Sequence, residues 1–282
     1  MGLIDTANRS LRQFGIEVFR AEPESLGYGT VGNAPLRNRV LRRLARAGFG
    51  VRRPYGADVP PHLAEIAERV RPYTMTSPQS VIGLCEAVEY IARTGVPGAL
   101  IECGVWRGGS VMAMALTLLQ CGVRDRELYL FDTFAGMTRP EERDRPMGDL
   151  GSPLEQWEAL RRDEGHNEWA YAPVEEVRAN VLSTGYPPDL VRFVMGPVEQ
   201  TLPHHAPSSI ALLRLDTDWH ASTRHELEHL YPRLVSRGVL ILDDYGSWAG
   251  AREAVDEFEP IRDLALFRLD NFCRIAVRPC KE

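Results

Sequence analysis

From Ser77 onward the chain alternates short apolar segments with longer amphipathic ones, and this alternation restricts its fold more than any other feature. Five of the apolar segments have the length of buried strands, and they cover residues 98–103, 127–132, 191–196, 210–216 and 239–244. Helical patterns lie between most of them. Strands separated by helices imply right-handed β-α-β crossovers and therefore a parallel sheet.

Two further apolar segments, residues 264–270 and 272–278, lie close enough in sequence to form an antiparallel hairpin. The sequence thus predicts an α/β Rossmann-like fold with a seven-stranded, mostly parallel sheet and a C-terminal antiparallel hairpin. Ser77 and Pro78 predict the N-cap and the first residue of a helix that precedes the first strand. We expect residues 71–282 to form this domain.

Residues 1–70 carry no recognisable chemistry but show apolar helical periodicity at 11–20, at 35–49 and from residue 62. We predict that they form a helical N-terminal extension that serves as an oligomerisation element or a lid, and that the protein is a homo-oligomer. A second long segment, residues 138–189, is polar and contains a helical pattern at 174–185. A long insertion between sheet elements is usually functional, so we expect it to face a substrate.

The net charge of −6 and the pI of about 5.7 argue against nucleic acid as the main partner. The basic run at 37–53 fits a solvated helix face better than a nucleic-acid or membrane arm. The five cysteines form no CxxC pair, which favours reduced thiols in a cytoplasm over zinc. The N-terminus lacks a signal-peptide core, and no apolar run reaches the length of a membrane span.

The first strand ends in a glycine-rich turn, Glu102-Cys-Gly104-Val-Trp-Arg-Gly-Gly-Ser110. Ligands of open α/β sheets bind outside the carboxyl ends of the strands, where glycines expose backbone and a helix N-terminus attracts carboxylate. The turn lacks the GxGxxG pattern of a dinucleotide site and fits S-adenosylmethionine (SAM) better, with Glu102 accepting from the methionine ammonium. A glycine turn needed only for packing is the alternative.

An acid also ends the second strand, at Asp132. A carboxylate at this position suits the hydroxyl groups of a ribose. A plain helix-capping aspartate is the alternative. The ends of the first and second strands both fit a nucleoside. Together they support a nucleoside site better than either strand end does alone.

Carboxylates cluster after the fourth and fifth strands, with Asp216 and Asp218 after one and Asp243 and Asp244 after the other. Neighbouring strands lie about 4.8 Å apart, so these acids converge and would repel one another without a cation. Oxygen ligands alone select Mg²⁺ or a similar hard cation. Arg214 is the basic residue of these motifs, and we expect its side chain to point to the opposite face from the acids.

His225 and His229 lie four residues apart in a predicted helix and resemble part of a metal-binding motif. The carboxylate cluster explains a metal better, so we interpret this helix as a solvated or core helix. His204 and His205 are expected in a surface loop.

Several of these motifs occur together and in order, namely TMTSP, ECGVWRGGS, FDTF, STGYP, LLRLDTDW and GVLILDDYGSW. From about Pro72 to Arg278 the chain resembles the macrocin O-methyltransferase family, which methylates sugars in antibiotic biosynthesis. The resemblance implies a class I methyltransferase fold, SAM as the methyl donor, Mg²⁺ as the metal and a small-molecule glycoside as the acceptor.

The resemblance also implies the site residues. The metal ligands would be Asp216, Asp243 and Asp244, with Asp216 also acting as the general base. The residues expected against the cofactor are Thr74, Met75, Glu102, Gly104, Val105, Trp106, Arg107, Ser110, Asp132, Thr133 and Phe134. His220 stands where the family often has Tyr, which puts an acceptor contact there in doubt.

Three other functions are weighed against this one. An NAD(P)-dependent oxidoreductase would share the sheet but predicts a GxGxxG turn and gives no role to the strand-end acids. A metal-dependent O-methyltransferase of a catechol or polyol would share the cofactor, metal and mechanism, and would differ only in its acceptor. A methyltransferase-like scaffold without activity is disfavoured by the intact acids.

Overall fold

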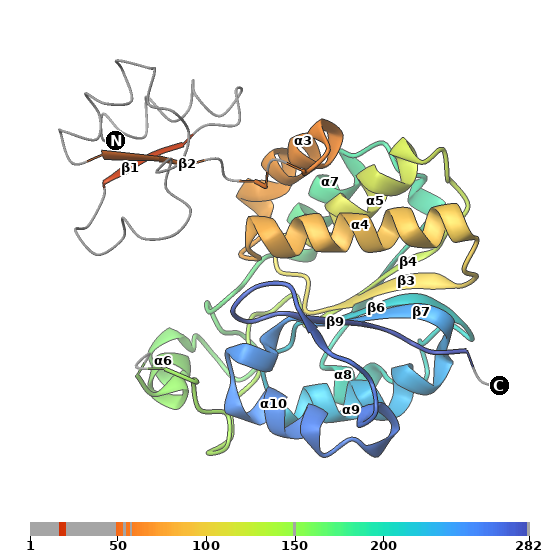
Figure 1. Ribbon diagram of the computed structural model, residues 1–282. Coiled ribbons are helices and arrows are strands. Elements are labelled where there is room, and N and C mark those ends of the chain that lie inside the picture. The colour runs from red at the N-terminus through yellow and green to blue at the C-terminus, as the bar shows by residue number, and fades with distance from the viewer. Residues whose placement is uncertain (1–16, 21–48, 53–54, 57, 149–150, 281–282) are drawn as a thin grey trace. The chain divides into compact units, whose positions relative to one another are not determined.

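A computed structural model describes residues 17–20, 49–52, 55–56, 58–148 and 151–280. Its main feature is a seven-stranded sheet of strand order β5-β4-β3-β6-β7-β9-β8 (Figure 1). The strands are β3 (Ala99–Cys103), β4 (Leu128–Asp132), β5 (Val191–Met195), β6 (Ile210–Leu215), β7 (Leu234–Leu242), β8 (Phe267–Arg268) and β9 (Arg274–Val277). The first five pair in parallel, and β9 pairs antiparallel with both β7 and β8. The predicted seven-stranded sheet with its C-terminal hairpin is confirmed.

Helices cover both faces of this sheet (Figure 1). On one face lie α4 (Pro78–Thr94), α5 (Gly109–Gln120) and α7 (Val174–Leu182), with α3 (Pro61–Val70) at their edge. On the other face lie α8 (Val198–Thr201), α9 (His220–Leu230) and α10 (Ala249–Asp256). The helix α6 (Pro153–Leu160) lies in the long segment after β4. Short 3₁₀ turns cover Arg71–Tyr73, Pro188–Leu190, Tyr231–Arg233, Asp244–Gly246 and Glu259–Ile261.

The start and end of α4 follow from its sequence. The hydroxyl of Ser77 accepts a hydrogen bond from the backbone N–H of Ser80, and Pro78 occupies the first turn, where no N–H is needed. Gly95 ends the helix with a φ of 66°, in the left-handed region that glycine adopts without cost. The predicted N-cap is therefore confirmed.

The two central strands, β3 and β6, are buried along their whole length. Their side chains are almost entirely apolar, as expected for strands covered by helices on both faces. Glu102 and Arg214 are the exceptions, and each is only 1% exposed. Because β3 pairs with β4 on one side and with β6 on the other, the connections from β3 and β6 diverge at this point. That switch point is where open α/β sheets bind their ligands.

Two element boundaries differ from the sequence expectation. The helix expected over residues 225–238 ends at Leu230, and β7 already begins at Leu234. Pro232 cannot donate the hydrogen bond that would continue the helix. The helix α6 was not predicted, because its pattern lies in a segment rich in Pro, Gly and Trp.

The N-terminal part differs more. Residues 17–20 and 49–52 form the antiparallel strands β1 (Glu17–Arg20) and β2 (Phe49–Arg52), so the helices predicted over 11–20 and 35–49 are wrong where they overlap these strands, at residues 17–20 and 49. Most of the two predicted helices, and most of the basic run, lie outside the described residues. The chain divides into compact units at residues 1–61 and 62–282, so α3 belongs almost entirely to the second unit. Assembly or lid function of residues 1–70 stays a prediction. Within the described residues no helix is long and apolar enough to cross a membrane.

Candidate active site

A cavity of about 340 Å³ opens at the carboxyl ends of β3, β4, β6 and β7. This volume lies within the range of small-molecule sites. Nine of the eleven residues expected against the cofactor line it, namely Thr74, Met75, Glu102, Gly104, Val105, Trp106, Ser110, Asp132 and Thr133. The three expected metal ligands, Asp216, Asp243 and Asp244, line the same cavity. Residues far apart in sequence therefore meet where the switch point predicts a site.

Arg107 and Phe134 do not line the cavity. The Arg107 guanidinium donates to Glu176 Oε1 at 2.6 Å and to the carbonyl of Pro72 at 2.8 Å, which ties the glycine turn to α7 and to the segment before Thr74. Phe134 is 6% exposed and packs against Phe193. Both residues support the cavity wall from behind.

Asp132 holds the glycine turn in shape. Its carboxylate accepts from the backbone N–H groups of Val105 at 2.7 Å, Trp106 at 3.2 Å and Phe134 at 2.7 Å. Burial raises the pKa of Asp132, and these three hydrogen bonds oppose that rise. The turn contains a residue under strain, since Trp106 has a φ of 45°. A role in shaping the turn was not foreseen for Asp132.

Glu102 lies at the bottom of the cavity with one oxygen paired and one unpaired. Its Oε1 accepts from Arg214 at 2.5 Å, and its Oε2 is buried without a hydrogen-bond partner among the described residues. Burial raises the pKa of Glu102 to about 8, against the lowering effect of the Arg214 charge. An unpaired buried oxygen is costly, so this atom marks a place where a donor from a ligand would fit.

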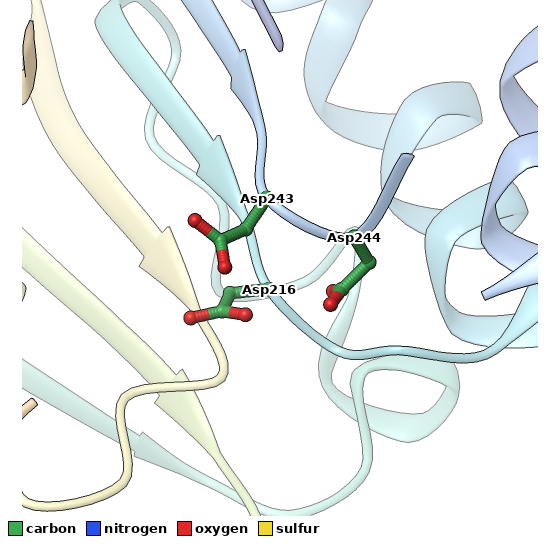
Figure 2. Close-up of side chains that lie close together, drawn as sticks. All are labelled: Asp216, Asp243 and Asp244. Atoms are coloured by element: carbon green, nitrogen blue, oxygen red, sulfur yellow. The ribbon is translucent and has the colours of Figure 1, made fainter. Parts of the chain in front are cut away.

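Figure 2 shows the carboxylates of Asp216, Asp243 and Asp244 turned toward one another. One oxygen from each lies within 4.8 Å of those of the other two. Burial raises the pKa values of Asp243 and Asp244. For Asp244, the neighbouring carboxylates raise the pKa further. A cluster of carboxylate oxygens in which burial opposes the ionisation of Asp243 and Asp244 is a donor set that a hard divalent cation stabilises.

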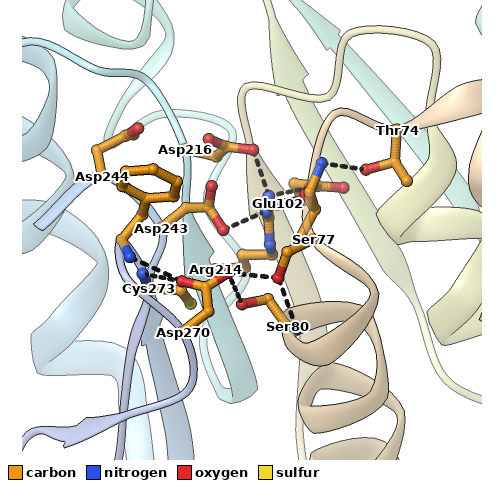
Figure 3. A network of polar contacts seen from close by, with 12 residues as sticks. Thr74, Ser77, Ser80, Glu102, Arg214, Asp216, Asp243, Asp244, Asp270 and Cys273 are labelled. Carbon is orange, nitrogen blue, oxygen red and sulfur yellow. Dashed lines mark hydrogen bonds and ion pairs between the residues drawn. The ribbon is translucent and has the colours of Figure 1, made fainter. Parts of the chain in front are cut away.

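The expectation that Arg214 points away from these acids is wrong. Its guanidinium donates to Asp216 Oδ2 at 2.6 Å and to Asp243 Oδ1 at 2.7 Å (Figure 3). Arg214 lies in β6 and Asp216 directly follows its last residue, Leu215, so the two-residue alternation of side chains continues far enough to bring both to one face. A buried cation therefore already offsets part of the charge of the cluster.

Comparison with known proteins identifies the family of this chain. The sequence profile of the macrocin-O-methyltransferase family matches residues 37–275. The chain belongs to this family. The expected family and the expected class of enzyme, an O-methyltransferase, are confirmed.

Named relatives give the same result. The chain is 37% identical to the 8-demethyl-8-(2,3-dimethoxy-alpha-L-rhamnosyl)-tetracenomycin-C 4'-O-methyltransferase of Streptomyces olivaceus, over 66% of this chain and 67% of that protein. It is 36% identical to the mycinamicin III 3''-O-methyltransferase of Micromonospora griseorubida, over 66% of this chain and 70% of that protein. The structure of the O-methyltransferase NovP superposes with a TM-score of 0.62 at 31% identity, covering 74% of this chain and 83% of that one.

In this macrocin-O-methyltransferase family member, three tryptophans form one wall of the cavity. The ring centroids of Trp219 and Trp248 lie 5.0 Å apart. The ring centroid of Trp169 lies 5.6 Å from that of Trp219 and 6.1 Å from that of Trp248. Trp169 and Trp248 line the cavity, whereas Trp219 is 2% exposed behind them and donates to the carbonyl of Thr138. This wall could not be predicted from the sequence, because its members come from three separate segments.

The long segment after β4 contributes to the site as expected. Its residues Gly136, Met137, Thr138, Trp169 and Ala170 line the cavity. Asp144, from the same segment, is 1% exposed and accepts from the backbone N–H of His220 at 2.8 Å. This bond fixes the loop to the start of α9.

Asp218 and His220 follow β6 closely but differ in their relation to the cavity. Asp218 lines the cavity with a strained φ of 66°, and its backbone N–H donates to Asp244 Oδ2 at 3.0 Å. His220 does not line the cavity and instead contacts Arg143 and Glu257. Whether His220 contacts the acceptor stays an open part of the prediction.

Four further histidines do not line the cavity. His225 and His229 pack edge to face with ring centroids 4.3 Å apart, and the cluster of possible metal ligands found within the described residues does not include them. Between them, Glu226 is fully buried and accepts from the hydroxyl of Thr217. His204 and His205 are exposed after α8.

Proposed function

We propose that this enzyme transfers a methyl group from SAM to a sugar hydroxyl of a natural-product glycoside, with Mg²⁺ bound at Asp216, Asp243 and Asp244. One observation carries the proposal. A single cavity at the switch point combines the unpaired oxygen of Glu102 with the three carboxylates that follow β6 and β7. The named relatives support the acceptor class, because their names specify a rhamnosyl-tetracenomycin and mycinamicin III.

The glycine turn would hold the donor. Glu102 Oε2 would accept a hydrogen bond from the methionine ammonium, which relieves the cost of leaving this atom unpaired. Thr133 and the turn residues Val105 and Trp106 line the neighbouring part of the cavity and would contact the nucleoside. This contact aligns the methyl group with the acceptor, as in-line transfer requires.

The carboxylate cluster would activate the acceptor. Bound Mg²⁺ lowers the pKa of a coordinated hydroxyl, which is otherwise too high for ionisation near neutral pH. Asp216 would accept the proton from that hydroxyl as general base. Asp243 and Asp244 would hold the cation next to Asp216, since one oxygen of each carboxylate lies within 4.8 Å of those of the other two.

The tryptophan wall would bind the acceptor ring. Trp169 and Trp248 line the same cavity as Asp218 and Asp244. A sugar has apolar C–H faces and polar hydroxyl edges, so an aromatic wall beside carboxylates matches both. The same wall helps to exclude water from the reacting atoms.

Titration calorimetry with SAM and NAD⁺ in parallel tests the donor. We expect SAM to bind and NAD⁺ not to bind, and the reverse result would overturn the proposal. Product formation from SAM is then measured with mycinamicin III, the rhamnosyl-tetracenomycin and a catechol, with and without EDTA. Methylation of a glycoside that EDTA abolishes is expected. Methylation of the catechol alone would assign the enzyme to a non-sugar acceptor.

A further inference from the structure

Arg214 lies between the two halves of the cavity and contacts both (Figure 3). Its side chain is 1% exposed. Toward the glycine turn it donates to Glu102 Oε1 at 2.5 Å and to the hydroxyl of Thr76 at 2.8 Å. Toward the carboxylate cluster it donates to Asp216 at 2.6 Å and to Asp243 at 2.7 Å. One rigid guanidinium therefore joins four side chains from four separate segments.

These contacts leave both halves able to bind a ligand. Arg214 takes one oxygen of Glu102, and the other oxygen of that carboxylate is unpaired among the described residues. It likewise takes one oxygen of Asp216 and one of Asp243, and each carboxylate has a second oxygen. The planar fork of an arginine suits this geometry because its donors are fixed relative to one another.

Thr76 connects Arg214 to residues 74–77, the segment that borders the cofactor half of the cavity. Residues 74–77 line the cavity. Thr76 links this segment to Arg214, whereas Ser77 and Ser80 link the same stretch of chain to Asp270. A ligand that orders residues 74–77 therefore also restricts the guanidinium.

We propose that Arg214 is a positioning residue that couples cofactor binding to cation binding, an inference that rests on the proposed SAM and divalent-cation sites. The cofactor site needs the guanidinium in the orientation that contacts Glu102 and Thr76. The cation site needs the same orientation, because it contacts Asp216 and Asp243. The ligand that binds first fixes that orientation, so the second binds to a site that is already ordered. The coupling is reciprocal by thermodynamic necessity.

Electrostatics separates this role from simple charge balance. If Arg214 only balanced the charge of the acids, Arg214→Lys would leave the cation affinity unchanged, because lysine keeps the positive charge. If Arg214 positions Asp216 and Asp243, its replacement weakens cation binding. Groups that hydrogen-bond to metal ligands typically change metal affinity by about 10–100-fold when they are replaced.

The test measures the Mn²⁺ dissociation constant of the full chain with and without saturating S-adenosylhomocysteine, which lacks the sulfonium charge. We expect the nucleoside to tighten Mn²⁺ binding of the wild type by about fivefold or more. Thr76→Val keeps all three ion pairs of Arg214, so its Mn²⁺ affinity without nucleoside should stay within about twofold while the tightening is lost. Arg214→Lys should weaken Mn²⁺ binding by about tenfold.

Ser80→Ala is the matched control, because it removes a hydroxyl hydrogen bond near the same segment without touching Arg214. It should keep the wild-type coupling. Wild-type protein that binds both ligands without mutual effect would overturn the inference and leave the proposed function standing. Tightening that survives in Thr76→Val would also overturn it, and so would an Arg214→Lys protein that binds Mn²⁺ as tightly as the wild type or more tightly. Wild-type protein that fails to bind either ligand would overturn the proposed function as well.

Discussion

Gly104 lies directly against the backbone of Asp216, so that a Cβ atom at Gly104 would be 1.8 Å from the Asp216 carbonyl oxygen. Gly104 also has a φ of 78°. The cofactor turn after β3 and the carboxylate strand β6 therefore meet without an intervening side chain. This contact places the proposed donor and acceptor halves next to each other.

Gly104→Ala should destabilise the protein by clearly more than the same change at Gly95. Both glycines have a left-handed φ, which costs an alanine about 1–2 kcal/mol. Gly95 has nothing within 4 Å of an added Cβ, so Gly95→Ala incurs this cost alone. Gly104→Ala must in addition push β3 from β6. Denaturant unfolding of the two variants measures the difference, and equal losses would show that the close contact is not rigid.

The sequence was sufficient to predict the strands and the edge of the sheet at which the site lies. Apolar segments that end in acids at residues 102, 132, 216 and 243 define both the parallel sheet and its carboxyl edge. Most expected cofactor positions line the cavity for this reason, because a strand end determines the place of the residues that follow it. Arg107 was misplaced because a turn residue can point to either side of the turn.

Other features could not be predicted because they depend on distant segments. The wall of Trp169, Trp219 and Trp248 joins the long insertion to the starts of α9 and α10. Arg214 was misjudged for another reason. The two-residue period of side chains along β6 predicts that Arg214 lies beside Asp216. We expected instead that an arginine within a buried strand points away from the site.

The affinity for SAM should rise with pH up to about pH 8. In the ligand-free protein the pKa of Glu102 is raised to about 8 by burial, so its carboxyl group holds a proton at lower pH. An ammonium group needs the ionised carboxylate, and binding at pH 7 should therefore release a proton. Calorimetry in buffers of different ionisation enthalpy measures this release.

Glu102→Gln is the control for this effect. It keeps the size of the side chain but cannot ionise, so we expect SAM affinity about tenfold or more weaker and independent of pH between about 6 and 8. A variant with wild-type affinity would remove Glu102 from the donor site.

Replacement of either half-buried tryptophan that lines the cavity should weaken acceptor binding. Trp169→Ala and Trp248→Ala each remove an aromatic contact worth about 0.5–1.5 kcal/mol, so the KM for a glycoside acceptor should rise about twofold to tenfold. Trp248→Phe should restore part of the loss. The KM for SAM should stay unchanged, and a matching rise in both constants would show that the wall supports the fold and not the acceptor.

Asp216→Asn should reduce turnover more than Asp243→Asn or Asp244→Asn. The first change removes both a proposed ligand and the proposed base, whose contribution is typically 10²–10⁴-fold. The kcat of the three variants with an acceptor methylated by the wild type gives the order. An Asp216→Asn enzyme as fast as the wild type would exclude Asp216 as the base.

Titration of the protein with Mn²⁺, followed by electron paramagnetic resonance, tests the central claim most directly because it needs no acceptor. The cluster of Asp216, Asp243 and Asp244 predicts one tight cation site in the wild type. Asp244 makes no ion pair with Arg214 among the described residues, so Asp244→Asn should remove a ligand without disturbing that network. We predict that Asp244→Asn loses tight Mn²⁺ binding and keeps SAM binding. An Asp244→Asn protein that binds Mn²⁺ as tightly as the wild type would contradict the account.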